Sequence, residues 1–322
     1  MLRKGPRGLP SIAQVREERS RRGDKWTMQA GLVAAGAIVA ALVAHSVISS
    51  RELKSNQSAL LAKQRAVEAT LGATWFPLRD RLEHDVLASA RDYAGDRVDD
   101  DVLRSPFRTR PGLYLRMRVA DAASPESIRA LAADAKKDAF AACLLREPNE
   151  RGTRGDPTGG GAFAEQPWNL GQVYAATRIL TDSWVREVKD ADDAMRLRVF
   201  TEQYDKAMRE EIPLAIDVVQ RSEFFLLVLD EDVAEAPRPA DGGPVQEDAL
   251  QLVPHPARVH LFDLKTNREL LRLRRSGDGL VISAGERQVT DPETIDAMHR
   301  QANNCALANL VNLAIARQGP ER

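Results

Sequence analysis

Hydrophobic residues are concentrated in one long run near the start of the chain and in short periodic runs after it. From Trp26 to Ile48 there is no Asp, Glu, Lys or Arg, and Ala30–Ala44 carries no polar side chain. A helix rises about 1.5 Å per residue, so roughly 20 residues cross a hydrocarbon core of about 30 Å. The run therefore predicts one transmembrane helix over residues 26–48, with Arg51 just beyond it.

Charge predicts the direction in which this helix crosses. Residues 1–25 carry eight Lys or Arg against three acids, whereas residues 51–322 carry 38 basic and 44 acidic residues. The positive-inside bias places residues 1–25 in the cytoplasm as a basic tail and the rest outside. The Ala- and Arg-rich composition is typical of bacteria. We expect a single-pass protein of the bacterial inner membrane, with a periplasmic or extracellular C-terminal domain. The alternative, a signal peptide cleaved near Ala44-His45-Ser46, delivers the domain to the same compartment.

Residues 49–104 are expected to form a helical stalk and a linker. Pro77 interrupts the helical pattern of the stalk and predicts a kink. Small residues four apart in the membrane run, such as Gly36 and Ala40, either let helices pack closely or simply fill an Ala-rich span. A homo-oligomer through the transmembrane and stalk helices is therefore a hypothesis. The apolar face of the stalk helix consists of Val67, Leu71, Trp75, Leu78, Leu82 and Val86.

Strand patterns begin after residue 105. Leu113–Val119 alternates apolar and polar residues, which predicts a strand with one solvated face. Phe224–Leu229 is an apolar run of strand length. Val259–Leu264 and Leu270–Arg274 flank a polar turn, which predicts a hairpin.

Helices are predicted between and after these strands. Ser124-Pro125-Glu126 has the residues of a helix start, helical spacing continues from Val173 to Val219, and the last helix starts at Asp291-Pro292-Glu293. The run Ala139–Leu145 fits a helix or a buried strand, and we favour a strand. Residues 147–167 are rich in Gly and Pro and predict a long loop. The apolar face of the last helix is expected at Ile295, Met298, Ala302, Ala306, Leu310 and Leu313.

Together these elements predict an α+β domain over residues 105–318, a mixed sheet packed by helices. No sequence motif within it indicates catalysis. The five histidines include no pair at the helical spacing of a metal site, and phosphate-binding and nucleophile-elbow motifs are missing from the sequence. A hydrolase would need an acid/base pair assembled from scattered residues. The near balance of 46 basic and 47 acidic residues argues against a nucleic-acid partner. We therefore expect no enzyme, no cofactor and no metal site.

Two sets of residues are candidates for a role in structure or binding. Cys143 and Cys305 would share an oxidising compartment, where they either form a disulfide or remain two buried thiols. Basic and aromatic residues on the expected wet face of the sheet form an interaction strip for an anionic glycan or an acidic partner. The alternative is that they are ordinary solvated sheet residues. The interaction strip consists of Tyr114, Arg116, Arg118, Arg272, Arg274 and Arg275.

Two passages resemble a group of envelope domains. IDVVQRSEFFLLVLDED and RVHLFDLKTNRELLRLRR, with the turn Asp263-Leu264-Lys265-Thr266, are similar to parts of the N-terminal domain of TolB, of the curli-assembly lipoproteins and of the penicillin-binding-protein activator lipoproteins. The chain departs from the lipoproteins because it has a predicted transmembrane anchor and lacks a lipobox cysteine. The resemblance implies a periplasmic adaptor or assembly role and carries over no catalytic residue.

These observations favour a noncatalytic adaptor or assembly component of the bacterial cell envelope. Its partners would be the membrane and other envelope proteins. The alternative is an extracytoplasmic sensor or small-ligand-binding protein, with residues 147–167 as a lid. A sensor would have to relay a signal, yet the 25-residue tail is too short to hold a signalling domain.

Overall fold

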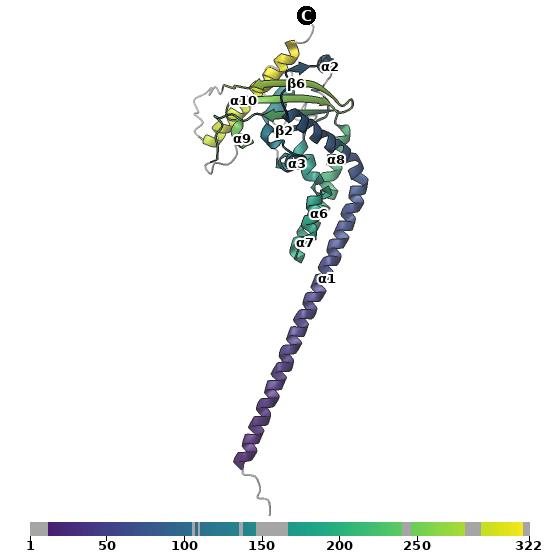
Figure 1. Cartoon of the computed structure of the whole chain (residues 1–322), viewed down its shortest axis with the longest axis vertical. Helices are drawn as coiled ribbons and strands as arrows, with labels where there is room; N and C mark the ends of the chain where they lie inside the picture. The colour runs from purple at the N-terminus through teal and green to yellow at the C-terminus, as the bar shows by residue number, and fades with distance from the viewer. Residues whose placement is uncertain are drawn as a thin grey trace, which may run out of the picture.

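A long first helix leads into a domain in which helices cover both faces of one sheet (Figure 1). The structure, a computed structural model, describes residues 12–104, 107–108, 110–134, 138–145, 167–239, 246–280 and 291–317, with the backbone alone at 12–49, 103–104 and 134. Among the side chains so described, no helix is long and apolar enough to cross a membrane. The side chains of the predicted span 26–48, and residues 147–166 of the predicted loop, lie outside the described part.

Helix α1 (Ile12–Ala90) is 79 residues long and joins the N-terminal region to the domain without a loop. Its first part projects away from the domain, and it bends as it reaches the sheet (Figure 1). Pro77 lies inside the helix without ending it, and proline is a common cause of bends. The predicted apolar face does pack on the domain, since Trp75, Leu82 and Val86 are buried in its core.

In the described part of the chain, six strands form one sheet in the order β1-β6-β5-β4-β2-β3. Strand β2 runs parallel to β3 and β4, whereas the other neighbours are antiparallel. The predicted α+β class, the strands predicted at Leu113–Val119 and Phe224–Leu229, and the hairpin are therefore confirmed. The strands are β1 (Arg97–Val98), β2 (Gly112–Arg118), β3 (Trp168–Asn169), β4 (Phe224–Asp230), β5 (Pro256–Asp263) and β6 (Arg268–Ser276).

Local chemistry explains the β5–β6 hairpin. The carboxylate of Asp263 accepts hydrogen bonds from the backbone N–H groups of Lys265 and Thr266, at 2.7 and 2.8 Å. Asn267 has a φ of 57°, in the left-handed region that asparagine tolerates better than most residues. The turn is therefore encoded in the sequence between the two strands.

Two apolar clusters lie on the two faces of the sheet. Leu115 and Leu227 face the larger cluster, which includes α1, α3, α5 and α8. Leu226 and Val228 face the other, which includes α4 and α10. The helical elements after α1 are α2 (Asp100–Arg104), η1 (Val119–Asp121), α3 (Pro125–Asp134), α4 (Ala139–Leu145), α5 (Leu170–Ala176), η2 (Thr177–Leu180), α6 (Asp182–Lys189), α7 (Ala194–Lys206), η3 (Ala207–Glu211), α8 (Ile212–Arg221), α9 (Glu247–Leu250) and α10 (Pro292–Arg317).

The expectation of a strand at Ala139–Leu145 is wrong, because this segment is helix α4. Phe140 and Leu144 lie four residues apart and are buried together, as on one face of a helix. The carboxylate of Asp138 accepts a hydrogen bond from the N–H of Phe140 at 2.8 Å, at the start of the helix. A continuous apolar run has no period of its own, so the choice between helix and strand depended on its surroundings.

The expected apolar face of the last helix is also wrong. Leu310 and Leu313 are exposed on α10. The prediction counted apolar residues alone, whereas the buried face includes two asparagines with buried hydrogen-bond partners. That face consists of Asn303, Asn304, Leu307, Ala308, Val311 and Ile315.

Helices α3 and α5 approach each other closely at Gly171. A Cβ atom on this residue would lie 2.0 Å from the carbonyl oxygen of Ala132. Since that oxygen belongs to backbone, the contact cannot be relieved by turning a side chain. Glycine at this position therefore allows α5 to pack beside α3 under the sheet.

Candidate functional site

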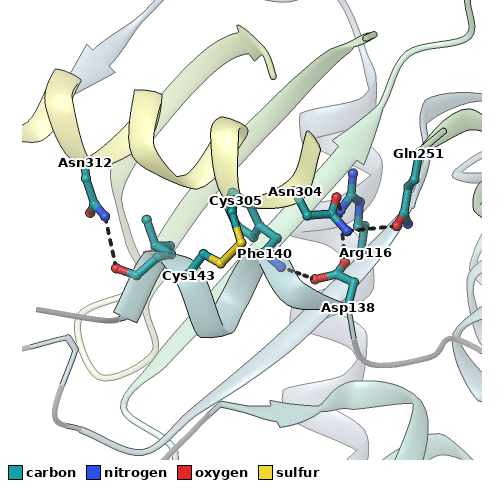
Figure 2. Close-up of a disulfide and its surroundings, with 9 residues drawn as sticks. Arg116, Asp138, Phe140, Cys143, Gln251, Asn304, Cys305 and Asn312 are labelled. Atoms are coloured by element: carbon teal, nitrogen blue, oxygen red, sulfur yellow. Dashed lines mark hydrogen bonds and ion pairs between the residues drawn. A yellow bond between two sulfur atoms is a disulfide. The ribbon is translucent and has the colours of Figure 1, made fainter. Parts of the chain in front are cut away.

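Several buried polar side chains meet at the C-terminal ends of β2 and β4, on the face covered by α10 (Figure 2). Arg116 is at their centre, with a side chain only 1% exposed. Its Nε and Nη2 donate to Oδ2 and Oδ1 of Asp230, at 2.7 and 3.0 Å. Its Nη1 donates to Oδ2 of Asp138 at 3.1 Å and to Oδ1 of Asn304 at 2.6 Å. We call Arg116, its partners Asp230, Asp138 and Asn304, and the side chains that hydrogen-bond to these residues the arginine cluster.

The charges of the arginine cluster stabilise one another. Burial alone would raise the pKa of Asp230, but the charge of Arg116 and the hydrogen bonds from His255 and Arg116 lower it to about 2. Tyr114 donates its hydroxyl hydrogen to Oδ2 of Asp138 at 2.6 Å. Burial, and then the negative charge of Asp138, raises the pKa of this tyrosine well above its usual range. Arg116 is thus fully charged between two carboxylates and beside a neutral phenol.

The outer side of the arginine cluster is built from residues of α9 and the segment after it. His255 hydrogen-bonds through Nδ1 to the carbonyl of Val253 at 2.8 Å and through Nε2 to Oδ1 of Asp230 at 2.9 Å. Nδ2 of Asn304 donates to Oε1 of Gln251 at 3.0 Å. Burial and the negative charge of Asp230, opposed by Arg116, raise the pKa of Glu247 to about 8. Glu247 is therefore largely protonated at neutral pH.

The arrangement of the arginine cluster is typical of side chains that hold elements of a fold together rather than of a catalytic centre. The polar atoms of Arg116, Asp230 and Asn304 are all directed at one another or at neighbouring side chains. Within the described residues, no group of three or more His, Cys, Asp or Glu side chains could hold a metal ion. A buried ion pair of this kind ties elements together, because removing either partner leaves an uncompensated charge.

A disulfide lies beside the arginine cluster. Cys143 of α4 is bonded to Cys305 of α10, with Cα atoms 5.2 Å apart. Figure 2 shows the disulfide next to Phe140 and Asn304, so it fastens α4 to α10 where Arg116 meets both. Nδ2 of Asn312, further along α10, donates to the carbonyl of Leu144 at 3.3 Å. Of the two alternatives that the sequence leaves open, the structure has the disulfide.

The predicted interaction strip is not one wet surface. Tyr114, Arg116 and Arg118 are buried beneath α4 and α10 or beside them. Arg272 lies on the opposite face, against the end of α1, and Arg274 shares that face because side chains alternate along a strand. Arg275 pairs with Asp96 at 2.6 Å. The expectation of one solvated strip fails because α4 and α10 cover the face that the polar residues of β2 occupy, whereas Arg272 and Arg274 lie on the other face.

Sequence reasoning missed most of the arginine cluster. Asp230, Asp138 and Asn304 come from three separate elements, and Asn304 is 188 residues from Arg116. One clue was present, since Asp230 follows directly on the apolar run of β4. A second was the pair Asn303-Asn304, which lies next to the apolar residues of the last helix. Neither pattern by itself distinguishes a buried partner from a solvated residue.

Helix α1 is held to the domain by polar as well as apolar contacts. Glu83 of α1 is buried and accepts two hydrogen bonds from Arg129 of α3, both at 2.7 Å. It also accepts the hydroxyl hydrogen of Tyr174 of α5 at 3.0 Å. Nearer the N-terminus, Nε2 of Gln57 donates to the carbonyl of Ala191, between α6 and α7, at 2.6 Å. The predicted stalk is therefore an integral part of the domain from Gln57 onward.

Comparisons of the chain with protein-family models, with curated proteins and with solved structures find no match. Inference about function therefore depends on the geometry of the chain.

Proposed function

We propose that the chain is a membrane-anchored extracytoplasmic adaptor or assembly component of the bacterial cell envelope that acts without catalysis. The observation that carries this proposal is the continuity of α1. The predicted span, residues 26–48, and the buried residues Trp75, Leu82 and Val86 belong to one helix. At about 1.5 Å per residue, the end of the span and Trp75 lie about 40 Å apart. A helix without a flexible joint would hold the domain at a set distance from the bilayer.

The chemistry of the domain supports the same role. The arginine cluster offers no free nucleophile and no metal set among the described residues. The disulfide between Cys143 and Cys305 is typical of a compartment outside the cytoplasm. The resemblance of the β4 and hairpin passages to envelope domains points in the same direction.

Membrane topology is the first test. A periplasmically active reporter, such as alkaline phosphatase, is fused after residue 60, and a cytoplasmically active reporter is fused at the same point. We expect activity from the first fusion and none from the second, because the basic tail should remain inside. The opposite pattern would remove the compartment on which the proposal depends.

Rigid positioning is tested by two matched insertions after Arg51, just beyond the predicted span. A flexible Gly/Ser segment breaks α1, whereas an Ala/Glu/Lys segment of equal length continues it as a helix. We expect crosslinking in native membranes to give a specific complex for the wild type. We expect the flexible insertion to weaken this complex more than the helical one. Recovery of the wild type without any partner, or equal loss with both insertions, would contradict the adaptor.

The alternative, a small-ligand-binding protein, has one observation in its favour. A pocket of about 150 Å³ lies between the end of α1 and the hairpin strands. Residues 147–166 of the predicted lid, 147–167, lie outside the described part of the chain, so this pocket has to be judged from its own residues.

A further inference from the structure

The pocket lies where the last turns of α1 cross β5 and β6, and we call it the α1–hairpin pocket. Its lining includes Asp85 of α1, Asp92 just after α1, His260 of β5, and Glu269 and Arg272 of β6. It is separate from the arginine cluster, which occupies the other face of the sheet. The proposed adaptor role does not involve these residues.

His260 presents an unused hydrogen-bonding atom in this pocket. The residue is only 2% exposed, and its ring stacks on Phe262 with the ring centres 6.0 Å apart. Its Nδ1 lies 2.7 Å from Oε1 of Glu269. Since a carboxylate can only accept, Nδ1 carries the hydrogen, and in the tautomer with one ring hydrogen Nε2 has a lone pair that can accept. That Nε2 is buried and has no hydrogen-bond partner among the described residues.

The charge of the α1–hairpin pocket favours a cation. Three carboxylates line it, from Asp85, Asp92 and Glu269, against the single guanidinium of Arg272. Partial burial, opposed by Arg81 and His84, raises the pKa of Asp85. A hydrogen-bond donor with a positive charge would stabilise the ionised form of this carboxylate.

The end of α1 already binds one cation within the chain. Nη1 of Arg258 donates to the carbonyl of Ser89 at 3.2 Å, at the C-terminal turn of the helix. Helix carbonyls carry partial negative charge at this end, which favours positive groups. The pocket lies directly beside this position, since Ser89 also lines it.

From these observations we propose that the α1–hairpin pocket binds a primary ammonium group, whose N–H groups donate to Nε2 of His260 and to the carboxylate of Asp85. An ammonium carries three donors and needs two or three acceptors, which this pocket supplies. A metal ion fits less well, because no three potential ligands among the described side chains are grouped closely enough. The ammonium could belong to a free amine or to a lysine side chain. The proposal does not depend on the adaptor role.

The test uses the full-length chain in detergent with ¹⁵N-labelled histidine, and follows the ring nitrogens by NMR. His260→Gln identifies the His260 signals by their loss. Three probes of similar size separate the contributions: ethylammonium has charge and donors, tetramethylammonium has charge alone, and ethanol has a donor alone. We expect a saturable shift of the His260 Nε2 signal with ethylammonium only. The same shift with tetramethylammonium or ethanol, or no shift with ethylammonium, would overturn the proposal.

A pair of variants tests the carboxylate. Asp85→Asn keeps the shape of the pocket and removes the charge of this side chain, so ethylammonium should bind about tenfold more weakly. Asp80→Asn is the matched control on the exposed side of the same helix, and its affinity should equal that of the wild type. Equal affinity of the Asp85 variant and the wild type would exclude the proposed contact. A blocked peptide with one lysine, binding more tightly than ethylammonium, would identify a protein as the source. Binding no tighter would identify a free amine.

Discussion

Replacing Arg116 with methionine should lower the free energy of unfolding of the domain by about 3–5 kcal/mol. The change keeps the length of the aliphatic stem and deletes the charge, so it leaves the carboxylates of Asp230 and Asp138 buried without their cation. Removing one partner of a buried pair typically costs about 3–5 kcal/mol. The pKa of Asp230 is consistent with this role, because Arg116 and His255 lower it to about 2 against the effect of burial. Typical domains have a total stability of about 5–15 kcal/mol, so a loss of this size is large enough to measure by equilibrium unfolding.

The measurement is urea unfolding of the full-length chain, followed by the fluorescence of the buried Trp75 and Trp184. Arg178→Met is the matched control, since Arg178 pairs with Glu187 at the same 2.7 Å but in an exposed position. It should cost less than about 1 kcal/mol. Adding Asp230→Asn to the Arg116 variant should recover part of the loss, because it removes an unpaired charge. Equal losses in the Arg116 and Arg178 variants, or strictly additive changes, would refute the assigned role of the arginine cluster.

Three further changes test other parts of the structure. Cys305→Ser should lower the free energy of unfolding by about 3–5 kcal/mol, because the disulfide closes a loop with a sequence separation of 162; an unchanged urea midpoint, with or without a reducing agent, would contradict this. Glu247 has a raised pKa, so its contribution to stability is complete below about pH 4.5 and is lost as the pH rises through about 8. Glu247→Gln should flatten the melting temperature across that range, and a wild-type slope in the variant would count against the raised pKa. Gly171→Ala should cost about 1–3 kcal/mol because its Cβ would overlap the carbonyl of Ala132, and a wild-type midpoint in urea would show that α3 and α5 can separate freely.

The pattern along the chain was sufficient for elements whose residues carry their own period or turn chemistry. β2, β4 and the hairpin of β5 and β6 follow from runs and alternation of apolar residues, and from Asp263 and Asn267 in the turn. The apolar face of α1 was also evident, because its residues recur at helical spacing. Each of these features is local, since it depends on neighbours within a few positions of the sequence.

Tertiary structure decided what the local pattern left open. Whether Ala139–Leu145 became a helix depended on the space between the sheet and α10, which no residue of that run specifies. Whether Tyr114 and Arg116 met water or partners depended on which face of the sheet α4 and α10 cover. A polar residue on a strand looks the same in sequence in both cases. The arginine cluster and the pocket at His260 exist because residues more than a hundred positions apart lie side by side in the fold. The spacing of residues along the sequence does not predict which of these distant residues come into contact.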